Sequence, residues 1–387
     1  MLNPTRVLQL ALASVLLTGC ASQHTAATAT NATTAGSPTQ PKAAETPAGR
    51  NYPPIRAGQS TPGAAPWVLP DGRLTPDVQS YAREVAQTRA IPESHVTTLL
   101  RQAQYNAEAA RLMSPSATRI KRSWVTYRRR FVDPVRMRAG ESFWRTHRST
   151  LDQAAETYGV PASVIVAIIG VETVYGRYTG NFSVLDALAT LGFRYPDPSR
   201  PERSQLFRDQ LADFIQLDYE GALNARQTTG SFAGAMGLPQ FMPGSLMRYA
   251  ADGDADGRID LHASTTDAIH SVARFLRLHG WVPGLPVFAP VQLPADPARL
   301  VAGGLEPTLT WEALQQAGAK AGTDGRWQTY KLGIVNLVDE PRGTVEYRTA
   351  TPNFFAITHY NRSYFYAASV ADLAHALAKK MNTPPVN

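Results

Sequence analysis

The chain of 387 residues is 43% hydrophobic and 18% charged, and it carries a formal net charge of +7. A chain of this length is too long for one small hydrophobic core, so roughly two or three globular units are expected. The apolar content excludes a chain that is disordered throughout. The basic charge favours anionic partners, namely nucleic acid, acidic lipid headgroups or carboxylate-bearing polymers. Cys20 is the only cysteine, so a disulfide framework is excluded.

The N-terminal residues have the layout of a secretory leader. Arg6 precedes an apolar run over residues 7–17, which is too short to span a bilayer comfortably. The run ends in LTGC, which resembles the lipobox of bacterial lipoproteins, where cleavage before the cysteine leaves a thiol that is acylated. We therefore expect a signal peptide over residues 1–19 and lipidation of Cys20, with a plain cleaved leader and an incidental cysteine as the alternative. Ser22 favours the outer membrane over the inner one, so the folded part would face the periplasm, and nucleic acid is not expected as a partner.

Composition and periodicity divide the rest of the chain. Residues 20–74 are rich in Ala, Thr and Pro without a helical or strand period, which predicts a disordered tether. Apolar residues at three- and four-residue spacing predict an N-terminal helical region over residues 75–150 and a helical core over residues 151–284. Short strand patterns, including a hairpin, place a small β-containing insertion at residues 285–350, and helix returns over residues 351–387. The predicted fold class is mainly α (α+β).

A lone acid, Glu172, follows an almost unbroken aliphatic run over residues 164–171 in VPASVIVAIIGVETVYGRYTG. A helix that is apolar all round is expected in a core, and Gly176 supplies its stop. Glu172 then lies in the last turn, where the helix dipole and, more strongly, burial both raise the pKa of a carboxyl group. A carboxyl that stays protonated near neutral pH is suited to general acid catalysis. The alternative is a glutamate that reaches solvent or Arg177.

Two other stretches carry candidate ligand-binding side chains. GSFAGAMGLPQFMPGS, residues 230–245, places glycines among small residues, where a backbone can come close to a ligand, and includes the amide of Gln240. TPNFFAITHYNRSYFY, residues 351–366, offers aromatic rings that can pack against sugars and polar groups that can hydrogen-bond them. Each also has a purely structural interpretation, the first as a tight turn and the second as core.

ADGDADGRIDLHASTTD contains alternating aspartates followed by a glycine, as in the first half of an EF-hand loop. The segment departs from that motif at position twelve, where Ala263 replaces a bidentate glutamate, and Asp267 is expected to close an enlarged loop. Asp-Gly pairs are also common in plain turns, but three clustered aspartates without a cation would repel one another. The predicted ligands of a structural Ca²⁺ ion are Asp252, Asp254, Asp256, Arg258 and Asp267.

GVETVYGRYTGNFSVLDALATLGF together with GSFAGAMGLPQFMP resembles the membrane-bound lytic murein transglycosylase B family, over roughly residue 75 to the C-terminus. The resemblance implies a goose-type-lysozyme-like helical core and cleavage of peptidoglycan glycan strands. It implies that Glu172 is the single catalytic acid and base, and that an enlarged loop holds Ca²⁺. It also implies substrate binding by Tyr127, Ser231, Gln240, Tyr360, Asn361 and Tyr366.

Ordinary glycosidases use two carboxyl groups. Asp186 and Asp197 are candidates for a second one only by their proximity to Glu172 in the sequence. The resemblance implies that one carboxyl suffices: Glu172 protonates the oxygen between N-acetylmuramic acid and N-acetylglucosamine. It then removes the proton of the muramyl C6 hydroxyl, which closes onto C1 to give a 1,6-anhydro product.

Two other functions stay open. One is a muramidase that hydrolyses the same bond with water, and the other is a non-catalytic lipoprotein that binds peptidoglycan. A protein of this fold that had lost catalytic activity would have no reason to keep Glu172, Ser231 and Gln240 together, which favours catalysis. The expected partners are peptidoglycan strands, the membrane through Cys20, and other cell-wall enzymes; no organic cofactor is expected.

Overall fold

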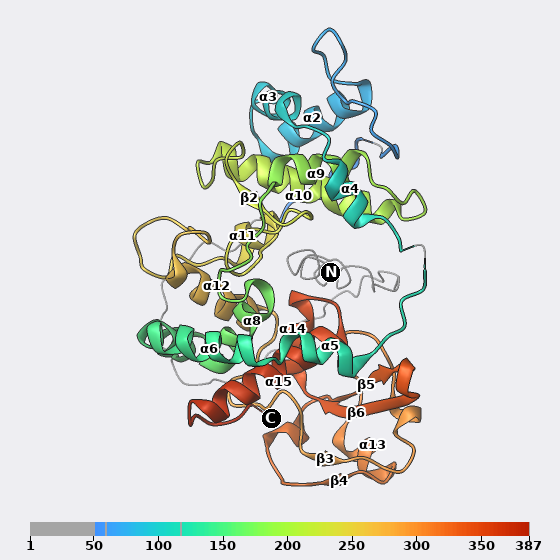
Figure 1. Ribbon diagram of the computed structural model, residues 1–387, viewed down its shortest axis with the longest axis vertical. Helices are drawn as coiled ribbons and strands as arrows, with labels where there is room; N and C mark the ends of the chain where they lie inside the picture. The colour runs from blue at the N-terminus through green and yellow to red at the C-terminus, as the bar shows by residue number, and fades with distance from the viewer. Residues whose placement is uncertain (1–50, 59, 117, 387) are drawn as a thin grey trace, which may run out of the picture.

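Helix α8 (Ala162–Thr173) lies in the lower half of the molecule in Figure 1, near α6 and α12. Ten of its twelve residues are buried, so no face of the helix is polar. Helices α6 (Pro134–Thr146), α7 (Arg148–Tyr158), α12 (Thr265–Leu278) and α15 (Tyr364–Lys380) pack around it. This arrangement confirms the expectation that an all-apolar helix occupies a core. The structure is a computed structural model that describes residues 51–58, 60–116 and 118–386.

A second core joins helices that are far apart in the sequence. Helices α2 (Pro76–Arg89), α3 (Glu93–Gln102) and α4 (Ala107–Met113) bury their apolar faces against α9 (Val184–Phe193) and α10 (Pro201–Tyr219). These helices form the upper part of the molecule in Figure 1. Helix α5 (Trp124–Phe131), by contrast, packs with α6, α8 and α15. The structure thus divides the predicted N-terminal helical region between two cores.

The structured part of the chain begins before residue 75, where the predicted tether was expected to end. Ile55 is fully buried and Trp67 is 2% exposed, both in the second core. The Trp67 indole Nε1 donates to the Leu100 carbonyl oxygen at 3.0 Å, and the Ile55 N–H donates to Asp209 Oδ1 at 2.8 Å. Composition alone missed this segment because a few large apolar side chains can anchor an otherwise polar stretch. The predicted leader, Cys20 and the first part of the tether lie outside the described residues.

Residues 285–350 form a small β-containing unit at the bottom of Figure 1. Strands β5 (Gly333–Asp339) and β6 (Thr344–Ala350) pair antiparallel, which confirms the predicted hairpin, and β3 (Val291–Gln292) pairs with β4 (Lys320–Ala321). Trp311, in α13 (Trp311–Gln316), and Trp327 meet in a core of their own, with ring centroids 4.9 Å apart. Short 3-10 helices complete the unit: η1 (Pro297–Leu300), η2 (Arg326–Thr329) and η3 (Glu340–Arg342).

Four further elements complete the fold: β1 (Phe182–Ser183), which pairs with β2 (Thr229–Gly230), α11 (Pro243–Tyr249) and α14 (Pro352–Tyr360). The fold is therefore mainly helical with small two-stranded sheets, as predicted. Within the described residues, no single helix has the length and apolar content of a membrane span. The pair α7–α8 meets that description only when both helices are combined, across a bend of 113°.

Trp67→Ala is expected to destabilise the protein by about 3–5 kcal/mol, because it removes a large buried ring and its hydrogen bond. Chemical denaturation of the purified protein would measure the change in unfolding free energy. Pro70→Ala, at an exposed position of the same segment, serves as the matched control. Equal stability of the two variants would show that residues 51–74 do not pack onto the helical core.

Candidate active site

Glu172 lies in the last turn of α8, and its side chain is partly exposed although nearly all of the helix is buried. The Tyr366 hydroxyl donates to Glu172 Oε1 at 2.5 Å. Tyr366 stands in the first turn of α15, where the Ser363 side chain accepts from its N–H and caps the helix. The helix packing that buries α8 therefore also supplies the partner of its terminal acid.

Burial raises the pKa of Glu172 to about 7, and the hydrogen bond from Tyr366 opposes that rise. The first influence dominates because an ionised carboxylate loses hydration in the protein interior. The negative charge of Glu172 in turn raises the pKa values of Tyr127, Tyr360 and Tyr366, in each case after the larger effect of burial. The acid is thus surrounded by tyrosines and remains substantially protonated near neutral pH.

Neither sequence neighbour acts as a second carboxyl in this site. Asp186 accepts from the backbone N–H of Gln104 at 2.8 Å, and Asp197 accepts from the N–H and hydroxyl of Ser199 at 3.0 and 2.6 Å. Among the described residues, no other acid changes the pKa of Glu172. The geometry therefore presents one carboxyl group and not a catalytic pair.

The glycine-rich segment over residues 230–241 is tied directly to the end of α8. The Thr173 hydroxyl donates to the Leu238 carbonyl at 3.0 Å, and the Tyr360 hydroxyl donates to the Pro239 carbonyl at 2.6 Å. Gln240 donates through its side-chain amide to the carbonyls of Thr179, at 3.1 Å, and Gly237, at 2.9 Å. Both amide hydrogens of Gln240 thus hold the fold, and its side-chain oxygen is the group that can accept a hydrogen bond from a ligand.

Glycine is required where the two segments meet. A Cβ added to Gly180 would lie 2.1 Å from the Gly230 carbonyl oxygen, and one added to Gly230 would lie 2.2 Å from the Ala235 carbonyl oxygen. Gly180 also has a φ of +90°. The close approach at these glycines is between two parts of this chain, and approach to a ligand stays a prediction.

The remaining predicted binding residues, Tyr127, Asn361 and Ser231, each carry a polar group that a ligand could reach with a hydrogen bond, and the charge of Glu172 acts on Tyr127. The Tyr127 hydroxyl and Asn361 Oδ1 are buried and have no hydrogen-bond partner among the described residues. The Ser231 hydroxyl oxygen accepts from the Ala235 N–H at 3.0 Å, which leaves its own hydrogen to donate elsewhere. Buried polar atoms without partners are uncommon in folded proteins, so Tyr127 and Asn361 suit contacts with a bound molecule.

Two residues that the sequence did not predict, Thr173 and Arg136, shape this site. Thr173 bridges α8 and the glycine-rich segment, and its hydroxyl also accepts from the Gly176 N–H at 3.0 Å. Arg136, on α6, is 5% exposed and donates through Nε to the Gly170 carbonyl at 2.8 Å. The position of Thr173 next to Glu172 was a usable signal, whereas nothing local identifies Arg136.

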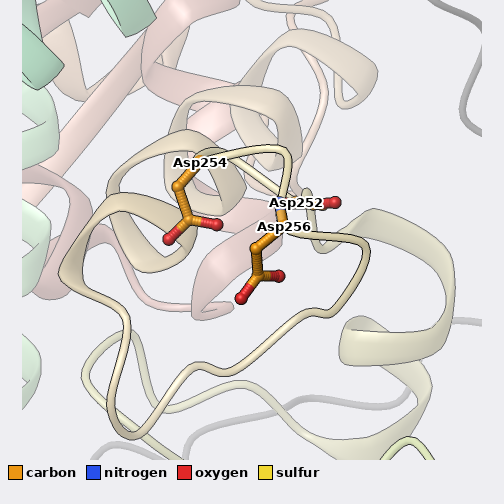
Figure 2. Close-up of side chains that lie close together, drawn as sticks. All are labelled: Asp252, Asp254 and Asp256. Atoms are coloured by element: carbon orange, nitrogen blue, oxygen red, sulfur yellow. The ribbon is translucent and has the colours of Figure 1, made fainter.

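The aspartate loop joins α11 to α12 and is largely exposed to solvent. Figure 2 shows its three clustered aspartates. Carboxylate oxygens of Asp252, Asp254 and Asp256 lie within 4.8 Å of one another. Asp267, 1% exposed, is not part of that group and accepts from the N–H groups of Gly253 and Asp260, each at 2.8 Å.

The donor chemistry of this loop fits a hard cation, because every charged donor in the group is a carboxylate oxygen. The charges of Asp254 and Asp252 add to burial in raising the pKa of Asp267. Arg258 is exposed, and its N–H donates to Asp256 Oδ1 at 2.8 Å. Asp267 thus shapes the loop through backbone hydrogen bonds, and its role as a closing ligand stays a prediction.

Tyr366→Phe is expected to raise the pKa of Glu172 above about 7, by roughly one to two units, because the donated hydrogen bond stabilises the charged carboxylate. A folded-state pKa above the ordinary 4.5 makes the folded state lose stability as pH rises from 4.5 to about 7. The variant should extend that loss to higher pH. Carbon-13 NMR titration of Glu172, beside thermal melts across pH, would measure both effects, and a lower pKa in the variant would contradict the assignment.

Comparison with known proteins agrees with this geometry. The sequence model of a family described as Transglycosylase SLT domain matches residues 73–375. The membrane-bound lytic murein transglycosylase B of Escherichia coli K12 is 34% identical over 322 residues, which are 78% of this chain and 83% of that protein.

Two solved structures share the fold. Lytic transglycosylase Slt35 of Escherichia coli, in complex with calcium, has a TM-score of 0.69 and 30% identity, covering 85% of this chain and 98% of that one. SltB3 of Pseudomonas aeruginosa, in complex with NAG-anhNAM-pentapeptide, has a TM-score of 0.65 and 29% identity, covering 78% of each chain. The chain therefore belongs to the membrane-bound lytic murein transglycosylase B family and is a lytic murein transglycosylase.

Proposed function

We propose that this enzyme cleaves the bond between N-acetylmuramic acid and N-acetylglucosamine without water, with Glu172 as the only catalytic acid and base. The observation that supports this most is a single carboxyl with a pKa of about 7 and no second acid beside it among the described residues. Most hydrolytic glycosidases use two carboxyl groups, one of them to act on water or to attack the sugar.

In the first step Glu172 gives its proton to the glycosidic oxygen, the bond from muramyl C1 to that oxygen breaks, and the N-acetylglucosamine leaves as an alcohol. Glu172 is then a carboxylate, and the Tyr366 hydroxyl at 2.5 Å stabilises its charge. In the second step the carboxylate takes the proton of the muramyl C6 hydroxyl as that oxygen bonds to C1. The 1,6-anhydro ring forms, Glu172 is protonated again, and no co-reactant is consumed.

The polar groups around Glu172 suit a sugar substrate. We assign the unpartnered Tyr127 hydroxyl and Asn361 Oδ1 to hydroxyl or acetamido groups, with Ser231 and the side-chain oxygen of Gln240 as further contacts. Tyr360 and Tyr366 would bind the sugar through their rings, which are nearly parallel with an interplanar angle of 14°. SltB3 of Pseudomonas aeruginosa binds an anhydro-muramyl fragment, which favours the same product here.

The acidic loop is proposed to hold a structural Ca²⁺ through the clustered Asp252, Asp254 and Asp256, with Arg258 and Asp267 as the other predicted ligands. Slt35 of Escherichia coli was crystallised with calcium, and the carboxylate group in this chain has suitable donors for that ion. Because the loop joins α11 to α12, a bound cation would stabilise the packing of α12 against α8 and would take no part in the reaction. Lipidation of Cys20 and an outer-membrane location remain proposals, supported by the membrane-bound name of the Escherichia coli relative.

Muropeptides released from purified sacculi would test the reaction. Mass spectrometry is expected to find anhydro-muramyl ends with the wild-type enzyme and no release with Glu172→Gln, since the amide cannot donate and recover a proton. Reducing ends from the wild-type enzyme would mean that water attacks and that the enzyme is a muramidase. Wild-type rates from Glu172→Gln would rule out the assigned acid.

Removal of Ca²⁺ by a chelator is expected to lower the melting temperature, because a cation that binds only the folded state stabilises it. Added Ca²⁺ should restore the melting temperature. In Asp254→Asn the difference in melting temperature between chelator and Ca²⁺ should be smaller than in the wild-type protein. Asp296→Asn, at an exposed acid outside the loop, is the control and should respond like the wild-type protein. Identical melts with chelator and with Ca²⁺ would exclude the proposed site.

A further inference from the structure

The backbone directly after the catalytic helix adopts an unusual conformation. Val174, Tyr175 and Gly176 have φ angles of 51°, 59° and 87°, so all three are left-handed. Only glycine adopts this conformation readily, because in other residues the Cβ atom approaches the backbone. Such strain persists where surrounding contacts over-determine the conformation, and it is common at functional sites.

The Tyr175 ring is held in a slot between two helices. A Cβ added to Gly140, on α6, would lie 2.4 Å from the Tyr175 hydroxyl oxygen, and one added to Gly170, on α8, would lie at the same distance. The Phe143 ring forms a further wall, with its centroid 5.2 Å from that of Tyr175. The slot exists because both helices carry a glycine where they face this ring.

The hydroxyl of Tyr175 does not explain the fit. It is buried without a hydrogen-bond partner among the described residues. Burial also raises the pKa of Tyr175, so the group stays neutral. The slot therefore uses the shape of the ring and not its polarity.

The left-handed turn directs the chain toward the other half of the active site. Four residues after Tyr175 the Thr179 carbonyl accepts from the side chain of Gln240 at 3.1 Å, and Gly180 then lies against Gly230. Continued helical dihedrals would extend α8 and carry the chain along its axis instead. The turn thus fixes how Glu172 faces the segment that carries Ser231 and Gln240.

We propose that Tyr175 is a positioning residue for the transglycosylase reaction: its ring, held between Gly140 and Gly170, fixes the left-handed turn that places Glu172 opposite Ser231 and Gln240. This proposal rests on the proposed role of Glu172. Tyr175 itself does not touch the reacting atoms, so its effect should appear in the chemical step and in the surroundings of Glu172 more than in substrate affinity.

The test adds a methyl group to the slot in the full-length enzyme. Alanine is normally preferred to glycine inside a helix, so Gly140→Ala should be harmless if the slot has no role. We expect instead a fall in kcat of about a hundredfold with little change in KM, as for a misplacement of about 1 Å at a reacting group. The alkaline limb of the kcat–pH profile should move to lower pH, because water admitted beside Glu172 favours its charged form.

Gly192→Ala, on α9, is the matched control. Its added Cβ would come no closer than 3.3 Å to its nearest neighbour, Arg208 Cγ, in contrast to 2.4 Å at Gly140, so kcat and the pH profile should match those of the wild-type enzyme. Adding Tyr175→Phe to Gly140→Ala should restore most of the activity, because the remaining contacts, at 2.8 Å to Leu377 Cδ2 and 3.1 Å to the ring Cζ, are more easily relieved. The same addition to Gly170→Ala should restore little, because Cζ stays 2.6 Å away.

Wild-type kcat and pH profile in Gly140→Ala would overturn the proposal. A lower melting temperature with an unchanged pH profile would also overturn it, because the slot would then affect only the stability of the fold and not the surroundings of Glu172. Should Gly140→Ala fail to fold, Tyr175→Leu keeps apolar bulk without the ring, and it must show the same fall in kcat. Carbon-13 NMR of the Glu172 pKa in these variants tests the positioning without any activity assay, whereas an active Glu172→Gln would refute the proposed function instead.

Discussion

Burial of α8 on all sides is the constraint on which the rest of this structure depends. The helix has no polar face, so α6, α7, α12 and α15 must cover it, and its last turn leaves the Glu172 side chain only partly exposed. Desolvation then raises the pKa of that carboxyl to about 7. The same packing that stabilises the fold thus produces an acid that holds its proton near neutral pH.

The site also depends on the junction of two helical cores. Thr173 and Tyr360 bond to the backbone of residues 238 and 239, and Gln240 bonds back to the loop after α8. These contacts join the glycine-rich segment, which pairs through β2 with β1 beside α9, to the acid at the end of α8. The proposed substrate-binding groups and Glu172 are therefore linked by direct hydrogen bonds between segments of the fold.

A mechanism with one carboxyl places unusual weight on these links. In the proposed mechanism the same group first protonates one oxygen and then deprotonates another, so it has to lie within reach of both. The Tyr366 hydrogen bond, the Thr173 bridge and the left-handed turn at Tyr175 each restrict where the Glu172 side chain can go. The strain in that turn is consistent with a backbone held for function.

The sequence by itself determined the features that depend on local pattern. The aliphatic run predicts a core helix with an acid at its end, alternating residues with a turn predict the β5–β6 hairpin, and the spacing of the aspartates predicts a clustered acidic loop. Each follows from the period of a helix, a strand or a turn, which neighbouring residues set. Membership of the family was visible in the two motifs around Glu172 and Gln240.

Only the tertiary structure decided which distant groups meet. The bond between Glu172 and Tyr366 joins residues 194 positions apart, the amide hydrogens of Gln240 are used by the fold, and residues 51–74 pack through Ile55 and Trp67. The slot for Tyr175 requires glycines on two helices at once. No local period encodes such contacts, because they arise from how separate apolar surfaces pack together and from the space that packing leaves.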